Sequence, residues 1–175
     1  MKKCYKDLKI LGICAGQGAL LFPWRKQLLG NIEPRAVFHT KKEEQWRLNF
    51  GEIPFLRNEL PEKWPPAIIL SSPDCGASST MRLSKAKELG NPEKNKSIQL
   101  VIEGIMKYQP KCFMIENVPR LMNLMPEKVW QEALPNYHIS FKVNSCLLYT
   151  SIPPNSTPQL YSYLVSLHFN ITIIH

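Results

Sequence analysis

One cysteine stands where an α/β enzyme would place a catalytic nucleophile. Cys75 follows Pro73 and Asp74, and this turn comes directly after the apolar run 67–70. Such a run is typical of a buried parallel strand, so the turn is expected at the carboxyl edge of the sheet, where open α/β folds bind ligands. A single cysteine is also compatible with a buried structural thiol. Two further segments favour the catalytic interpretation.

The first of these segments is a glycine-rich turn. The apolar run 8–14 stops at residues 15–18, which include Gly16 and Gly18, and a segment with helix-compatible apolar residues follows over 19–29. Strand, glycine turn and helix in this order let the backbone approach a ligand closely and present unpaired amides to it. The pattern predicts a nucleotide-type site, and a plain tight turn is the alternative.

The second segment brings a carboxylate to the end of another buried strand. The apolar run 111–115 leads directly to Glu116 and Asn117. A charge directly after a wholly apolar strand is rarely incidental, although both residues could instead cap a helix expected over 120–134. Because the carboxyl ends of parallel strands meet at one edge, we expect Glu116, Cys75 and the glycine turn to share a cleft.

The rest of the chain alternates between predicted strands and helices. This alternation predicts a single α/β domain over residues 1–175, with a doubly wound, mostly parallel, seven-stranded sheet and helices on both faces. Further strands are expected over 35–39, 55–60, 138–148 and 160–169, and further helices over 42–49 and after Ser97, which is expected to act as the cap.

Composition indicates the class of partner. The 175-residue chain carries a formal net charge of +8 and has a pI near 9.3, which favours a polyanion such as nucleic acid. The basic segment after Cys75, with Arg82, Lys85 and Lys87, is a candidate for phosphate contacts, or else a solvated surface. The five cysteines are widely spaced and lack nearby histidines, so neither a metal site nor a disulfide framework is expected. With no apolar window long enough for a bilayer, we expect no membrane contact and a cytoplasmic protein, or a nuclear one in a eukaryote.

Together these segments resemble the DNA (cytosine-5)-methyltransferases over residues 8–165. Residues 13–18 resemble the family's Phe-x-Gly-x-Gly signature, residues 72–79 its Pro-Pro-Cys-Gln-x-x-Ser signature, and residues 113–118 its Glu-Asn-Val signature, in the family's order. The resemblance implies a Rossmann-like class I methyltransferase fold, the cofactor S-adenosyl-L-methionine and double-stranded DNA as partner. It implies catalytic roles for Cys75, Ser79, Glu116 and Asn117, and cofactor contacts from Cys14, Ala15, Gly16, Gln17, Gly18 and Pro73.

The family's reaction explains why a thiol and a carboxylate are needed. Carbon 5 of cytosine is too electron-poor to attack a sulfonium methyl group, so a thiolate first adds to carbon 6. By resemblance, Cys75 is this nucleophile, and Glu116 holds or protonates ring nitrogen 3 as charge develops. The target base would be flipped out of the duplex, with the basic segment after Cys75 closing over it.

The sequence also departs from the family pattern. Thr157 and Gln159 replace both arginines of the later Gln-x-Arg-x-Arg signature, which removes charge-assisted contacts to the base. The strand expected over 35–39 supplies no acid for the ribose of the cofactor, and the chain stops where a target-recognition domain would begin.

Three alternatives remain from these departures. The chain is one subunit of a split enzyme whose companion recognises DNA, a degenerate remnant, or a catalytically silent module that binds cofactor or DNA. The split-enzyme alternative predicts exposed apolar surface. An RNA cytosine methyltransferase is less favoured, because the second cysteine-containing motif typical of the tRNA-acting branch is missing.

Overall fold

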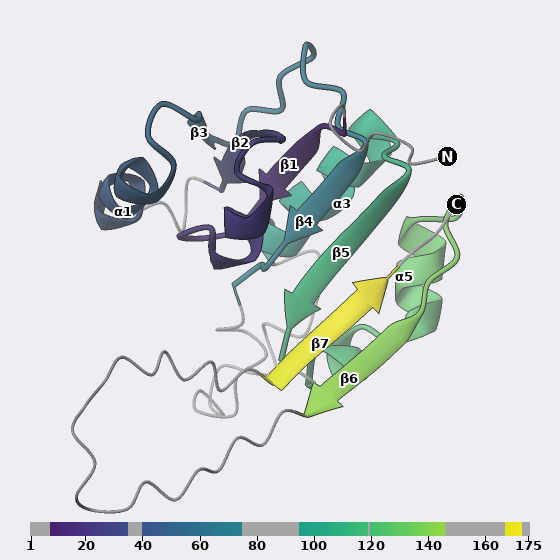
Figure 1. Cartoon of the computed structure of the whole chain (residues 1–175). Coiled ribbons are helices and arrows are strands. Elements are labelled where there is room, and N and C mark those ends of the chain that lie inside the picture. Colours follow the sequence, from purple (N-terminus) through teal and green to yellow (C-terminus); the bar gives the residue numbers. More distant parts are fainter. Residues whose placement is uncertain (1–7, 35–39, 75–94, 119, 146–166, 173–175) are drawn as a thin grey trace, which may run out of the picture.

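Seven strands form one sheet in the computed structural model, which describes residues 8–34, 40–74, 95–118, 120–145 and 167–172 (Figure 1). Their order across the sheet is β3-β2-β1-β4-β5-β7-β6. This arrangement confirms the predicted Rossmann-like α/β fold. The strands are β1 Ile10–Ile13, β2 Leu28–Glu33, β3 Phe55–Arg57, β4 Ile68–Ser71, β5 Cys112–Asn117, β6 Phe141–Ser145 and β7 Leu167–Thr172.

The strand order reverses next to β1. The chain runs from β1 to β2 and β3 on one side, and then crosses to β4 and β5 on the other, with every one of these neighbouring pairs parallel. Only β7 is antiparallel, pairing with both β5 and β6. The carboxyl ends of β1 and β4 therefore flank the point at which open α/β sheets bind their ligands.

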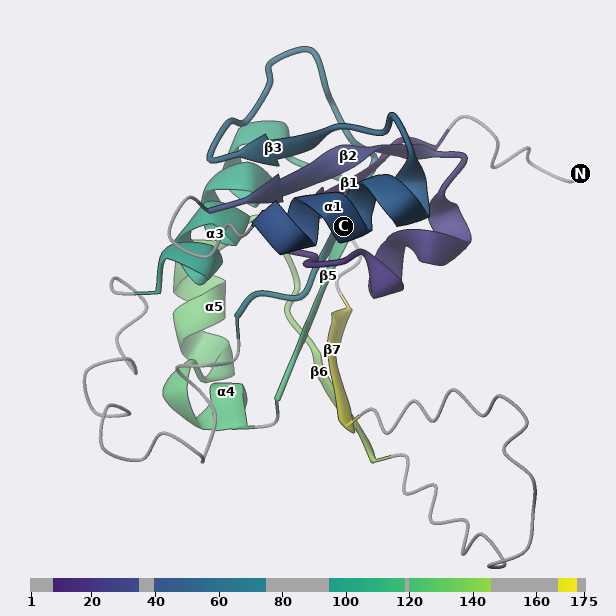
Figure 2. The same ribbon diagram turned by 90° about the vertical axis from the view of Figure 1, so that its left-hand side faces the viewer.

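Helices cover both faces of the sheet (Figure 2). On one face Val101 and Ile105 of α3 pack with Ile13 and Phe113 in a buried cluster. On the other face Trp46 of α1 packs in a second cluster with buried residues of η2 and of the strands. The helices are the 3-10 helix η2 Ala19–Trp24, α1 Thr40–Phe50, α3 Lys96–Tyr108, α4 Arg120–Leu124 and α5 Glu127–Ala133.

The second strand differs from the sequence prediction. The helix expected over 19–29 is only the short η2, which contains Pro23, and β2 already begins at Leu28. Proline has no amide hydrogen and disrupts the interior of an α-helix, which accounts for the short 3-10 turn. The segment 35–39, predicted to be the second strand, lies outside the described residues.

Two helix predictions also need correction. Asn95, and not Ser97, caps α3, because its side chain accepts hydrogen bonds from the amides of Ser97 and Ile98 at 3.1 and 3.2 Å. The helix expected over 120–134 is divided at Pro126 into α4 and α5.

In the described part of the chain, no helix combines the length and apolar character that crossing a membrane requires.

Candidate active site

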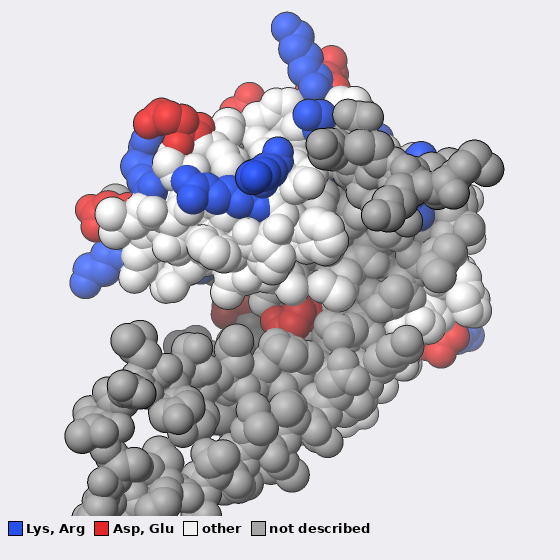
Figure 3. Space-filling model, in the orientation of Figure 1, with Lys and Arg blue, Asp and Glu red and all other residues white. Residues whose placement is uncertain are grey.

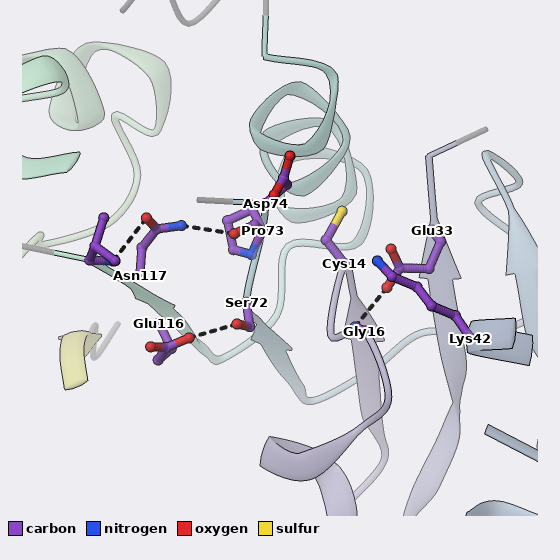
Figure 4. A pocket seen from close by; sticks show the side chains of 10 residues that line it. Cys14, Gly16, Glu33, Lys42, Ser72, Pro73, Asp74, Glu116 and Asn117 are labelled. Atoms are coloured by element: carbon purple, nitrogen blue, oxygen red, sulfur yellow. Dashed lines mark hydrogen bonds between the residues drawn. The ribbon is translucent and has the colours of Figure 1, made fainter. Parts of the chain in front are cut away.

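A cavity of about 250 Å³ lies at the carboxyl edge of the sheet, beside the point where the strand order reverses (Figure 4). Its walls come from the ends of β1, β2, β4 and β5 and from α1. Acidic side chains lie in the recess visible at this edge in Figure 3. The lining residues are Cys14, Gly16, Glu33, Lys42, Ser72, Pro73, Asp74, Glu116, Asn117 and Val118.

Two glycines shape the turn after β1 for different reasons. Gly16 and Gly18 both have positive φ angles, 60° and 84°, which favour glycine. A Cβ atom on Gly16 would meet no atom within 4 Å, so the backbone borders open space there. A Cβ atom on Gly18 would lie 2.3 Å from Cε2 of Phe50. The missing side chain of Gly16 therefore leaves space for a ligand, whereas that of Gly18 avoids a clash with Phe50 in the core.

Glu33 is the acid that the sequence prediction missed. It ends β2, is only 1% exposed and lines the cavity. Its Oε1 accepts hydrogen bonds from the Gly16 amide at 2.7 Å and from Nδ2 of Asn31 at 3.0 Å. The prediction that no acid follows the second strand is thus wrong. The missed signal was an acid 17 residues after Gly16, near the spacing of about 20 residues known for ribose-binding acids.

The cavity carries more negative than positive charge. Glu33, Asp74 and Glu116 contribute carboxylates, and within the described residues Lys42 of α1 is the only cation in the lining. Figure 4 shows the Lys42 side chain extending toward Glu33. Such a site favours a ligand with net positive charge.

Two hydrogen bonds join the turn after β4 to the end of β5. Ser72 Oγ donates to Oε2 of Glu116 at 2.6 Å, and Nδ2 of Asn117 donates to the carbonyl oxygen of Pro73 at 2.8 Å. The Asn117 Oδ1 accepts from the Val118 amide at 2.9 Å, so its contacts lie at the strand ends and not on the amides of α4. The turn that leads to residue 75 is therefore held against the carboxylate of β5.

Comparison with known proteins identifies the fold. No protein-family model and no curated protein matches the sequence. A mutant of DNMT2 from Spodoptera frugiperda is 18% identical, with a TM-score of 0.64 over 96% of this chain and 50% of that chain. The methyltransferase EhMeth of Entamoeba histolytica is 17% identical, with a TM-score of 0.63 over 97% of this chain and 53% of that chain. The chain has a methyltransferase fold.

A third similar structure is a putative DNA modification methyltransferase encoded within an Escherichia coli prophage. It is 14% identical, with a TM-score of 0.63 over 96% of this chain and 47% of that chain. The chain thus spans about half the length of the methyltransferases that it matches.

The described residues include part of the predicted site. Cys14, Gly16, Pro73, Glu116 and Asn117 line the cavity, whereas Ala15, Gln17 and Gly18 belong to the same turn without lining it. The other predicted site residues lie outside the described residues, and their roles stay predictions. They are Cys75, Ser79, Arg82, Lys85, Lys87, Thr157 and Gln159.

Cys14 is poorly suited to act as a nucleophile. Its side chain is buried, and its Sγ donates to the carbonyl oxygen of Ser97 at 3.5 Å. Burial, and next the negative charge of Glu33, raise the pKa of the Cys14 thiol well above its usual value. Because the thiolate is the reactive form, Cys14 is expected to border the cavity as an inert thiol.

This property can be measured by alkylation. At about pH 8 we expect iodoacetamide to modify Cys14 at least about tenfold more slowly in the folded chain than in the urea-unfolded chain. Peptide mass spectrometry gives the rate for each cysteine. Cys112, which is only partly buried, serves as the internal comparison. Equal rates for Cys14 in the two states would contradict its assignment as an inert thiol.

Proposed function

We propose that this chain transfers a methyl group from S-adenosyl-L-methionine to carbon 5 of cytosine in double-stranded DNA, through a covalent adduct with Cys75. One observation supports this proposal most strongly. Ser72 and Pro73, in the turn that leads to Cys75, are hydrogen-bonded to Glu116 and Asn117, at the cavity that Glu33 also lines. The similarity to the putative DNA modification methyltransferase of the prophage supports DNA as the substrate.

The described residues fit the cofactor. The backbone of Gly16 borders open space, and one oxygen of Glu33 is held by two donors while the same carboxylate lines the cavity. The excess of carboxylates suits a ligand with a positively charged sulfonium and ammonium group. When bound, S-adenosyl-L-methionine supplies an electrophilic methyl group. Glu33 would accept hydrogen bonds from its ribose hydroxyls.

The residues of the chain then act on the base. The Cys75 thiolate adds to carbon 6 of cytosine, and Glu116 supplies a proton or a hydrogen bond to ring nitrogen 3, so that carbon 5 becomes nucleophilic. Ser72 orients the Glu116 carboxylate through its 2.6 Å hydrogen bond. Transfer of the methyl group to carbon 5 breaks its bond to the sulfonium sulfur. A base or water then removes the proton from carbon 5, the bond from the Cys75 sulfur to carbon 6 breaks, and Cys75 leaves as the thiolate.

A companion subunit is part of the proposal. Phe22 and Trp24, which both lie on the short helix η2, are 57% and 43% exposed. Large exposed apolar side chains are frequent at protein interfaces. They support a split enzyme in which a second polypeptide supplies DNA recognition, because reading bases requires side chains in a groove of the DNA.

The test measures tritium transfer from labelled S-adenosyl-L-methionine to a cytosine-containing duplex, by the chain alone and with the product of any neighbouring reading frame. Incorporation at carbon 5 and a covalent complex with 5-fluorocytosine DNA are the expected results. The control is Cys75→Ala, and undiminished transfer by this variant would overturn the assigned nucleophile. Cofactor binding without transfer or covalent complex would instead favour a binding module, and transfer to RNA alone would change the substrate.

A further inference from the structure

We propose that Asn31 is a positioning residue for cofactor recognition, which holds Glu33 and the glycine turn in one fixed arrangement. This inference rests on the proposed function, because it requires the ribose of the cofactor to bind at Glu33. Asn31 lies in the middle of β2, two residues before Glu33, and it is 0% exposed. Its amide group is therefore committed to partners inside the protein.

The hydrogen bonds of Asn31 determine the orientation of its amide. The Ala15 amide donates to Oδ1 of Asn31 at 3.2 Å, while Nδ2 of Asn31 donates to Oε1 of Glu33 at 3.0 Å. A backbone amide can only donate and a carboxylate can only accept, so the opposite amide orientation would break both bonds. One side chain thus links the turn after β1 to the acid at the end of β2.

These hydrogen bonds make the two carboxylate oxygens of Glu33 different. Both donors, the Gly16 amide and Nδ2 of Asn31, bond to Oε1. Within the described part of the chain no hydrogen bond is made to Oε2, which leaves this oxygen to accept from a ligand hydroxyl. A vicinal diol, such as that of ribose, offers the donors that a carboxylate needs. Without Asn31 the carboxylate loses one of the bonds that limit its rotation.

A glycine on the neighbouring strand β1 leaves space for the Asn31 side chain. Gly12 of β1 is the register partner of Asn31, and a Cβ atom on Gly12 would lie 2.8 Å from Oδ1 of Asn31. The same Cβ atom would lie 2.5 Å from Cδ1 of Leu21. Glycine at this position therefore makes room for an amide that the core would otherwise exclude.

The test compares the binding of S-adenosylhomocysteine with that of its 2′-deoxyribose analogue by calorimetry. We expect the wild-type chain to prefer the ribose form by about tenfold or more, as for hydrogen bonds to a charged group. Asn31→Ala is expected to reduce this preference below about threefold. The control is Ser71→Ala, which removes the buried 2.5 Å bond from Oγ to the carbonyl of Ile13 without touching Glu33, and which should keep the preference.

A second variant provides a rescue experiment. In Asn31→Asp two carboxylates would lie side by side, so one of them would hold a proton at a higher pH than usual. The protonated form can donate to Glu33 as Asn31 does, so the ribose preference should rise between about pH 8 and pH 6 in this variant and not in wild type. The other charged or titratable cavity residues, Cys14, Lys42, Asp74 and Glu116, are the same in both proteins.

The outcomes separate the inference from the proposed function. If the wild-type chain binds neither ligand, both fail. If it binds with a ribose preference that Asn31→Ala retains, only the role of Asn31 is overturned. Should the Asn31 variants not fold, the NMR resonances of the Asn31 side-chain amide in the wild-type protein provide the test. They should shift with S-adenosylhomocysteine and shift less with the deoxy analogue, and equal shifts or none would overturn the proposal.

Discussion

Glu116→Gln is expected to lower the rate of methyl transfer by about 10²- to 10⁴-fold, the usual range for loss of a general acid. Glutamine keeps the shape of the side chain and can still accept the 2.6 Å hydrogen bond from Ser72. It cannot deliver a proton to ring nitrogen 3 of the base. Initial rates of tritium transfer, with the companion polypeptide present if the chain requires it, measure the effect.

Two comparisons test whether the lower rate of Glu116→Gln comes from loss of the acid. Binding of S-adenosylhomocysteine should be unchanged within about threefold, because Glu33 and Gly16, and not Glu116, are assigned to the cofactor. Ser72→Ala leaves the carboxylate in place and removes only the group that orients it, so we expect a loss of about tenfold or less. A Glu116→Gln variant with a rate close to wild type would exclude Glu116 as the acid.

The sequence predicted the central strands well because their burial leaves a simple pattern. β1, β4 and β5 lie in the middle of the sheet, and Ile13, Ile69 and Phe113 are in its buried core. Continuous apolar runs of this kind have few alternatives when breakers flank them. β2 is also buried, but it contains Gly30 and the polar residue Asn31, so its pattern is not that of an apolar strand.

Because β2 was not predicted, Glu33 at its end was not recognised as a site residue. With the second strand expected over 35–39, Glu33 was assigned no role. Its function depends on tertiary contacts, since Gly16 and Asn31 bind its carboxylate across the ends of two strands. By contrast, Glu116 was found because it follows an unbroken apolar strand. The positions of Gly16, Glu116 and Asn117 at the cavity were predictable from the sequence, and the polar network that links β2 to the glycine turn was not.

Gly18→Ala is expected to destabilise the fold by about 2–5 kcal/mol, the sum of overpacking and backbone strain. The new Cβ atom would lie 2.3 Å from Cε2 of Phe50 and 2.9 Å from Cζ3 of Trp46. Neither ring can move aside, because both are buried and they stack with centroids 4.1 Å apart. The φ angle of 84° adds strain for any residue with a side chain. Thermal and urea unfolding measure the loss.

Gly16→Ala is the matched control in the same turn. Its φ angle of 60° imposes similar backbone strain, but no atom lies within 4 Å of the new Cβ atom. We therefore expect a loss of about 1–2 kcal/mol, together with weaker binding of S-adenosylhomocysteine, because Gly16 lines the cavity and Gly18 does not. If Gly18→Ala and Gly16→Ala lose the same stability, backbone strain explains both losses. The close approach of Gly18 to Phe50 and Trp46 of α1 would then contribute nothing to the need for glycine.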